Sequence, residues 1–316
     1  MPQVSIITAL HNKGPYIAET IRSVLAQTRS DWELIVVENG STDNGPDVVR
    51  QFMDTRIRLV VSPKCGPGAA RNFGLALATG AWVLFLDADD LIAPNYLEER
   101  LGLLRNQPQA DLLVGCWEEF KDGSSEPAVI RKPAAHGGTD ADLANAAIAH
   151  APWALHAALV RKSRILEGRL WSEEMDGLPS EDTAFWFPVV YEASILWSEN
   201  AGALYRVQTE TSRNEIKDVK RWMHAVLGVI RHNVDYLKVR NIRPNQQQCA
   251  SIVRVLESTY RLCLSRQSRA EAKLALEEAN NWLKICPASS LAITVRKTLG
   301  LRIFNLLRYG VMGLCL

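Results

Sequence analysis

Short apolar runs alternate with amphipathic segments over the first part of the chain. The apolar runs predict strands at 4–10, 33–37, 58–61, 82–86 and 111–117. Between them, apolar residues recur at helical spacing, as in Ile17, Ile21 and Val24. The strands are apolar almost throughout, which is typical of a parallel sheet covered by helices on both faces. The pattern therefore predicts an α/β fold with a mostly parallel central sheet flanked by helices.

The rest of the chain changes character in two steps. Less regular patterns predict helices over 140–149 and 182–191 and strands over 153–160, 195–197 and 204–207. From about residue 215 the pattern is helical throughout. We therefore predict one domain over 1–212, with halves at about 1–110 and 111–212, and a helical C-terminal appendage over 213–316.

Charge adds a second difference between these parts. The net charge of +1 is small, and the 47% of hydrophobic residues is ordinary for a globular protein. Residues 213–316 carry 18 basic and 7 acidic residues, a net +11, whereas residues 1–212 carry 18 basic and 28 acidic residues, a net −10. A basic segment can meet an anionic lipid, acceptor or nucleic acid, or dock on an acidic domain. No nucleic-acid-binding motif is recognisable, so nucleic acid is not expected as a partner.

The C-terminal end offers a specific candidate for membrane contact. Apolar residues Leu299, Ile303, Leu306, Leu307 and Val311 would share one face of a helix, with Arg302, Asn305 and Arg308 opposite. Such a helix could lie in a membrane interface, but packing on the rest of the protein is the more common arrangement. No signal peptide or spanning segment is indicated, so we expect a cytoplasmic protein, with peripheral contact at the inner membrane face as a hypothesis.

Polar clusters follow three of the predicted strands. They are 10–12, 38–41 and 87–90. Because ligands of open α/β sheets bind at the carboxyl ends of the strands, their common placement predicts one site built from several loops. Six scattered cysteines show no metal-binding spacing, so we expect them to be reduced.

The acidic cluster of Asp87, Asp89 and Asp90 is the most informative of these. Carboxylates spaced in this way at a strand end suit a hard divalent cation that also takes phosphate oxygens. The same cluster would fit a helix start, since Pro94 is near, or a phospho-receiver domain. Alone, it leaves these alternatives open.

Two further motifs can carry chemistry. Gly66 to Arg71 is a loop of small residues entering a helix, where the backbone can approach a ligand and Arg71 can grip a diphosphate. Glu181 and Asp182 precede an aromatic segment, where a carboxylate can serve as a general base. The alternative interpretation of the first motif is an ordinary loop before a helix, and that of the second is a pair of acidic residues at a helix start.

Together, these motifs resemble family-2 glycosyltransferases in their order along the chain. The matching segments are 4–13, 23–28, 32–43, 69–80, 85–90 and 181–186. The resemblance is strongest over 3–110 and extends to about 210. It implies a GT-A fold and inverting transfer from a nucleotide-diphosphate sugar.

The resemblance also implies a role for each site residue. Asp89 would hold Mn²⁺ or Mg²⁺ against the diphosphate, Asp87 would lie near the ribose or the metal, and Arg71 would contact the nucleotide. Asp182 would be the base, because the second acid of the Glu181–Asp182 pair has that role in the family. The remaining residues expected to contact the nucleotide-sugar are Ala9, His11, Glu38 and Asn39.

The nucleotide end departs from the usual family pattern. His11 stands near the place of a usual Tyr and would stack on the base instead, and Asn39 stands where an Asp commonly bonds uracil. Since an amide both donates and accepts, a UDP-sugar remains the expected donor. The acceptor would be a carbohydrate or lipid-linked hydroxyl in cell-surface polysaccharide or glycolipid synthesis. Trp117, Trp153, His156 and Trp171 could stack on it, although core packing is more common.

Other functions fit less well. A nucleotidyltransferase would have a Gly-rich loop and a basic pair after the first strand, and a Rossmann dehydrogenase would have GxGxxG there; residues 8–12 provide neither. A non-catalytic nucleotide-sugar-binding or scaffold protein on the same fold is the main alternative.

Overall fold

A computed structural model describes residues 2–105, 107–122, 128–134, 137–207, 218–286, 296 and 300–305. The chain divides into two compact units, each described by itself. The first comprises 1–140, 152–177 and 189–212, and the second comprises 141–151, 178–188 and 213–316.

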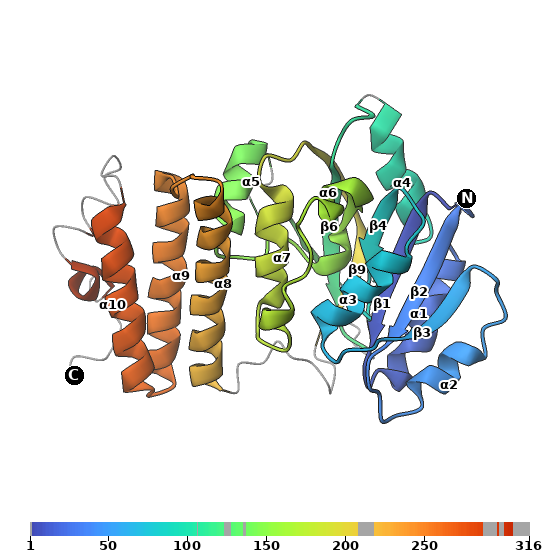
Figure 1. Cartoon of the computed structure of the whole chain (residues 1–316), viewed down its shortest axis with the longest axis horizontal. Helices are drawn as coiled ribbons and strands as arrows, with labels where there is room; N and C mark the ends of the chain where they lie inside the picture. Colours follow the sequence, from blue (N-terminus) through green and yellow to red (C-terminus); the bar gives the residue numbers. More distant parts are fainter. Residues whose placement is uncertain are drawn as a thin grey trace. The chain divides into compact units, whose positions relative to one another are not determined.

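The first unit is built on one mixed, mostly parallel sheet with helices around it (Figure 1). Its strands run in the order β3-β2-β1-β4-β8-β6-β9-β5, and β7 pairs with β6. The strands are β1 (Val4–Leu10), β2 (Trp32–Glu38), β3 (Ile57–Val61), β4 (Trp82–Phe85), β5 (Leu91–Ile92), β6 (Leu112–Phe120), β7 (Val129–Arg131), β8 (Ala158–Arg161) and β9 (Ile195–Arg206). Strands β1, β2, β3 and β4 pair in parallel, as the apolar runs predict.

Helices connect these strands. They are α1 (Gly14–Leu25), α2 (Gly45–Arg50), α3 (Pro67–Leu77), α4 (Tyr96–Gly102) and α6 (Lys162–Leu166). Helix α3 packs on β1 and β2, and Gly74 makes this close approach possible because a Cβ there would lie 2.6 Å from a methyl of Ile7. The core is apolar: Ile6, Leu34 and Val83 are fully buried, each burial contributing about 1.5–3 kcal/mol.

The second half of the sheet corrects several sequence predictions. A single strand, β9, replaces the two predicted over 195–197 and 204–207, and the predicted strand over 153–160 shortens to β8. Residues 155–157 form a 3₁₀ turn instead. Strand β8 is antiparallel to β4 and β6, whereas β6 and β9 are parallel.

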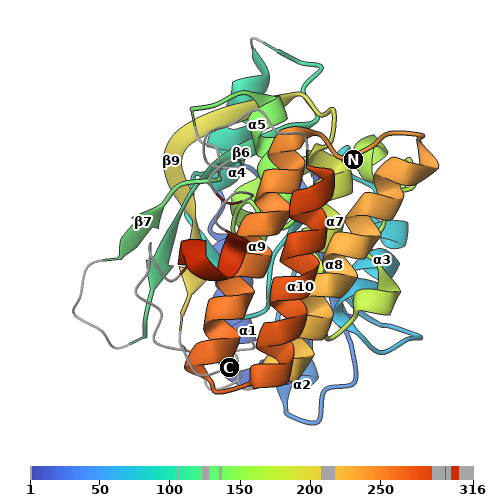
Figure 2. The ribbon, with the colours of Figure 1, turned by 90° about the vertical axis from the view of Figure 1, so that its left-hand side faces the viewer.

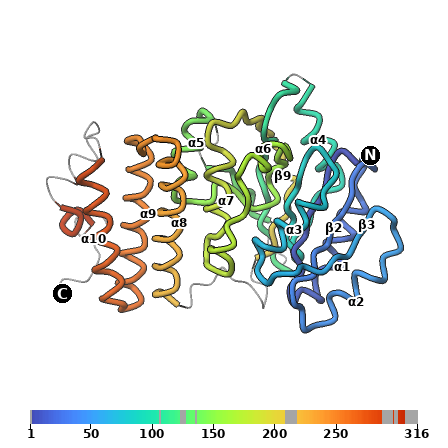
Figure 3. The backbone as a smooth tube through the Cα atoms, viewed as in Figure 1, coloured from blue at the N-terminus to red at the C-terminus, as the bar shows by residue number. Residues whose placement is uncertain are grey.

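The second unit is helical. It contains most of α5 (Asp140–Ala147) and α7 (Glu181–Val190), together with α8 (Val219–Val239), α9 (Gln246–Ser265) and α10 (Arg269–Ile285). Helices α8, α9 and α10 lie side by side and are joined by short connections (Figures 2 and 3). No described helix is both long and apolar enough to cross a bilayer. Of the predicted C-terminal apolar face, Leu299, Leu306, Leu307 and Val311 lie outside the described residues, as does Arg308.

Candidate functional site

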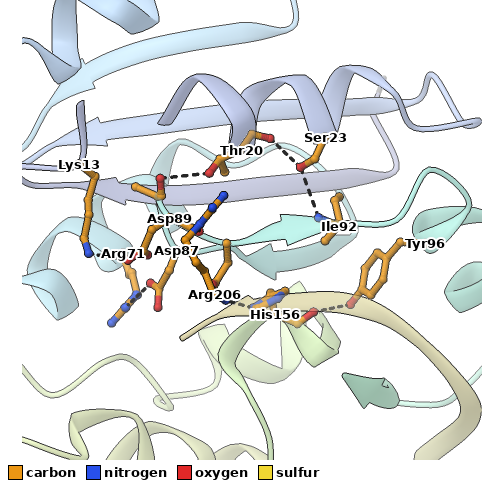
Figure 4. Close-up of polar contacts among 12 residues, drawn as sticks. Lys13, Thr20, Ser23, Arg71, Asp87, Asp89, Ile92, Tyr96, His156 and Arg206 are labelled. Carbon is orange, nitrogen blue, oxygen red and sulfur yellow. Dashed lines mark hydrogen bonds and ion pairs between the residues drawn. The ribbon is translucent and has the colours of Figure 1, made fainter. Parts of the chain in front are cut away.

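The polar clusters meet at one edge of the first unit's sheet. The register pairs Leu10 with Glu38 and Ile7 with Phe85, so strands β1, β2 and β4 end close together. Side-chain contacts then join the loops that follow these strands, as Figure 4 shows for the β1 and β4 loops. The sequence prediction that these loops come together agrees with the structure.

His11 and Asn39 form the β1–β2 part of this edge. Nδ1 of His11 lies 2.9 Å from the backbone oxygen of Asn39, and because a carbonyl can only accept, Nδ1 carries the hydrogen. The imidazole is exposed, and its other nitrogen, Nε2, lies 3.4 Å from Asn12 Nδ2. The Asn39 amide donates to the Lys64 carbonyl and accepts from the Gly66 amide, each at 2.9 Å. Asn39 therefore anchors the loop before α3, and an Asp there could not donate to Lys64.

Glu38 and Ala9 belong to the strand ends themselves. The Glu38 carboxylate accepts from the backbone N–H of Ser41 at 2.5 Å and fixes the turn after β2. Ala9 is half-buried inside β1 and pairs with Val37, so its backbone is committed to the sheet. These contacts define the shape of the edge.

Arg71 projects from α3 to the acidic loop. Its Nη2 donates to Asp87 Oδ1 at 2.9 Å, and its guanidinium lies 4.3 Å from the centre of the Trp171 ring. Although Arg71 is only 4% exposed, the Asp87 side chain is 33% exposed. Asp87 and Trp171 thus orient the buried guanidinium of Arg71 toward the more exposed acidic loop. Trp171 and Trp153 are themselves buried, in keeping with core packing.

The glycines before Arg71 allow a close approach of another carboxylate. Asp176 accepts hydrogen bonds from Gly68 N at 2.6 Å and Ala69 N at 3.0 Å, and so caps the start of α3. A Cβ on Gly66 would lie 2.1 Å from an Asp176 oxygen. The sequence suggested that the backbone at the start of α3 could approach a ligand. In this structure the Asp176 carboxylate occupies that place.

Asp89, the predicted metal ligand, is paired with a lysine. Lys13 Nζ lies 2.5 Å from Asp89 Oδ2, and the two side chains are 17% and 16% exposed. Among the described residues, no three His, Cys, Asp or Glu side chains form a group that could hold a metal by themselves. One or two carboxylates nevertheless fit Mg²⁺ or Mn²⁺ that takes its other ligands from phosphate oxygens and water.

The third acid, Asp90, points into the protein. Its Oδ1 accepts from the backbone N–H of Arg206 at 2.8 Å, and its Oδ2 lies 3.2 Å from His156 Nδ1 without the alignment of a hydrogen bond. Burial, with the charges of Asp89 and Asp87, raises the pKa of Asp90 well above its ordinary value. Asp90 is therefore a structural acid of the loop.

Arg206 holds the loop from the end of β9 and was missed in the sequence. Its Nε donates to the backbone oxygen of Asp89 at 2.7 Å (Figure 4). Its other nitrogens contact Glu19, at 2.7 Å, and Asp122. The sequence did offer one signal, because Arg206 is a charged residue at the end of a partly apolar strand. A buried charged residue is nearly always paired, so an arginine at this place indicates acidic or carbonyl partners nearby.

His156 provides a pH-dependent prediction. Burial lowers the pKa of His156 from 6.5 to about 4. Between these two pH values the imidazole is therefore neutral in the folded protein and protonated in the unfolded chain. Stability is therefore expected to fall as the pH drops from 6.5 to about 4, by roughly 3 kcal/mol at about 1.4 kcal/mol per pKa unit.

Urea unfolding near neutral pH and near pH 4 would measure this effect in the wild type and His156→Asn. The variant should lose less stability on acidification. The raised pKa of Asp90 acts in the opposite direction in both proteins. Equal losses in the two proteins would contradict the prediction.

Asp182 belongs to the second unit. It lies half-buried in the first turn of α7, next to buried Glu181 and before the aromatic pair Phe185 and Trp186, whose ring centres are 5.0 Å apart. Within this unit, Asn233 of α8 donates to the backbone oxygen of Thr183 at 3.4 Å and ties α7 to α8. The role of Asp182 as a base stays a prediction.

Comparison with known families gives two matches. The model described as "Glycosyl transferase family 2" matches residues 5–156, and the one described as "Glycosyl transferase family group 2" matches residues 82–299.

Curated relatives match less than half of the chain. TuaG of Bacillus subtilis, whose name assigns it to teichuronic acid biosynthesis, is 36% identical over 135 residues, which is 42% of this chain and 54% of TuaG. Glycosyltransferase GlyG of Streptococcus pneumoniae is 30% identical over 122 residues, 38% of this chain and 40% of GlyG. The match thus spans about half or less of these relatives' own length.

Solved structures share the fold at low identity. Staphylococcus aureus TarS in complex with UDP-GlcNAc superposes with a TM-score of 0.68 at 18% identity, covering 91% of this chain and 82% of that one. The mannosyltransferase PcManGT of Pyrobaculum calidifontis, in complex with GDP-Man and Mn²⁺, has a TM-score of 0.56 at 16% identity, covering 98% and 82%. The predicted GT-A-like α/β fold is confirmed.

Proposed function

The chain belongs to glycosyl transferase family 2, and we propose that it transfers a sugar from a nucleotide-diphosphate sugar to an acceptor hydroxyl with inversion. The acidic loop after β4 carries this proposal. There, Asp87 faces Arg71 and Asp89 faces Lys13 at the carboxyl edge of the sheet. Carboxylates interleaved with cations suit a diphosphate that binds together with a divalent cation.

We propose a UDP-sugar as the donor. The TarS and PcManGT complexes contain different nucleotide-sugars, UDP-GlcNAc and GDP-Man, so the choice of base rests on this chain's own residues. The exposed ring of His11 offers a face for stacking. Asn39 uses one hydrogen and one lone pair on the loop backbone, which leaves one of each for a uracil edge. Ala9 and Glu38 complete the proposed nucleotide end.

Asp89, with Asp87 beside it, would hold Mn²⁺ or Mg²⁺ together with the diphosphate. Such an ion, when bound, offsets the negative charge of the departing nucleoside diphosphate. Arg71 supports the same charge from the protein side, because its guanidinium is buried, oriented by Trp171 and directed toward the acidic loop.

Asp182 is the proposed general base. It would accept the proton of the acceptor hydroxyl while that oxygen bonds to the anomeric carbon from the face opposite the diphosphate. The bond between the anomeric carbon and the diphosphate oxygen breaks in the same step, so the configuration inverts. The carboxylate then carries the proton, and the nucleoside diphosphate carries the released electron pair.

For the acceptor, we propose a carbohydrate or lipid-linked hydroxyl in cell-surface polysaccharide or glycolipid synthesis. The name of TuaG supports this class of pathway. The basic 213–316 segment supports peripheral contact with an anionic membrane at the cytoplasmic face. Flotation with anionic liposomes would test that contact, and unchanged flotation after deletion of 291–316 would exclude this terminal segment as its cause.

A thermal-shift screen tests the donor proposal. UDP-, dTDP- and GDP-sugars are added with and without Mn²⁺, and a UDP-sugar with Mn²⁺ should raise the Tm most. At a ligand concentration of about 100 times Kd the added stability is roughly 2.7 kcal/mol, or several degrees. If no nucleotide-sugar stabilises the protein, the donor site is wrong. Binding without donor hydrolysis or transfer would instead favour a scaffold protein.

A further inference from the structure

Lys13 occupies the position that a cation would need at Asp89. Its ammonium lies 2.5 Å from Asp89 Oδ2, and both side chains are largely shielded from solvent. Figure 4 shows Lys13 extending from the loop between β1 and α1 toward the acidic loop. A divalent cation at this oxygen would place its charge directly beside the ammonium, so the two compete for Asp89.

We propose that Lys13 is an internal counter-ion that makes metal binding at Asp89 depend on the nucleotide diphosphate. This inference rests on the proposed function. The ammonium leaves Asp89 readily only when another anion receives it, and a diphosphate at the same edge supplies that anion. The metal then takes Asp89 while Lys13 turns to the phosphate oxygens.

Charge balance gives the physical reason. Asp89 is neutralised by Lys13, and Asp87 by Arg71. A divalent cation alone would place uncompensated positive charge beside two cations, and a diphosphate alone would meet two carboxylates. Arriving together, the two ligands keep the site balanced, so each should raise the affinity for the other.

The surroundings make Lys13 the group that moves. The backbone of the acidic loop is fixed, because Arg206 binds the Asp89 carbonyl at 2.7 Å and the Asp90 carboxylate at 2.8 Å. Arg71 is buried and stacked on Trp171. Lys13, by contrast, is a point charge on a flexible four-carbon stem, which can change partners without a backbone movement.

The coupling is measurable without catalysis. Mn²⁺ binding to the full chain would be followed by electron paramagnetic resonance, with and without UDP. In the wild type, UDP should tighten Mn²⁺ binding by roughly tenfold or more. Lys13→Met should bind Mn²⁺ alone about tenfold more tightly than the wild type, and UDP should improve that binding much less.

Two further variants separate charge from structure. Lys13→Arg keeps the positive charge and should retain weak Mn²⁺ binding in the absence of UDP. Lys132→Met removes an exposed lysine whose Nζ lies 3.2 Å from Glu199, and should behave as the wild type. Tighter Mn²⁺ binding in both Lys13 variants, or in neither, would overturn the inference. If no protein binds Mn²⁺ even with UDP, the metal-dependent donor site itself is wrong.

Discussion

Asp182→Asn is expected to lower kcat for sugar transfer by about 10²- to 10⁴-fold, the usual contribution of a general base. An amide has nearly the same shape as the carboxylate but cannot take the acceptor's proton. Asp182 lies in the first turn of α7 and is not among the residues proposed to contact the nucleotide-sugar. The affinity for the nucleotide-sugar should therefore change little. Steady-state kinetics and a donor titration would measure the two quantities.

Glu181→Gln is the matched control, because it alters the neighbouring carboxylate in the same helical turn. Glu181 is buried, so this variant can lose some stability, and activity must be compared at a temperature where both variants are folded. Loss of transfer in Glu181→Gln but not in Asp182→Asn would assign the base to Glu181. Transfer retained by both would place the base elsewhere.

The parallel half of the sheet could be predicted because its signal is local. Strands β1, β2 and β4 are continuous apolar runs between helices, and burial on both faces demands such runs. Strand β5 has two residues and depends on pairing with Leu204 and Ala203, far along the chain. Strand β9 looked like two strands because its middle is polar, and its register against β6 shifts near Cys116. Long-range pairing supplies what local pattern lacks.

The candidate site also has a part that the sequence predicts and a part that it does not. The proximity of His11, Asn39 and Asp87 could be predicted, because parallel strands end at one edge of the sheet. The partners that neutralise or hold them could not: Asp176 is more than a hundred residues from the glycines it approaches, and Arg206 is equally far from Asp89. A sequence pattern predicts where a ligand can bind, whereas the balance of charge around it depends on contacts that only the folded chain creates.

Arg206→Met is expected to lower the free energy of unfolding by about 2–4 kcal/mol. Methionine keeps an apolar stem near the rings of Tyr16 and Phe120, but it removes the hydrogen bond to the Asp89 carbonyl and the contacts with Glu19 and Asp122. The Asp89 carbonyl then loses its donor at the loop that carries the candidate metal ligand. Urea unfolding at neutral pH would measure the loss.

Arg131→Met is the control for removing an arginine from the same sheet. The Arg131 side chain, on edge strand β7, is 52% exposed and lies 2.9 Å from Glu119, whereas the Arg206 side chain is 2% exposed. Because water screens and replaces an exposed ion pair, removing it should cost much less stability than removing Arg206. Glu19 and Asp122 are both more than half exposed, so they can regain water when Arg206 is lost. This places the expected loss below that of a fully buried pair, and equal losses in Arg206→Met and Arg131→Met would show that Arg206 does not hold the acidic loop.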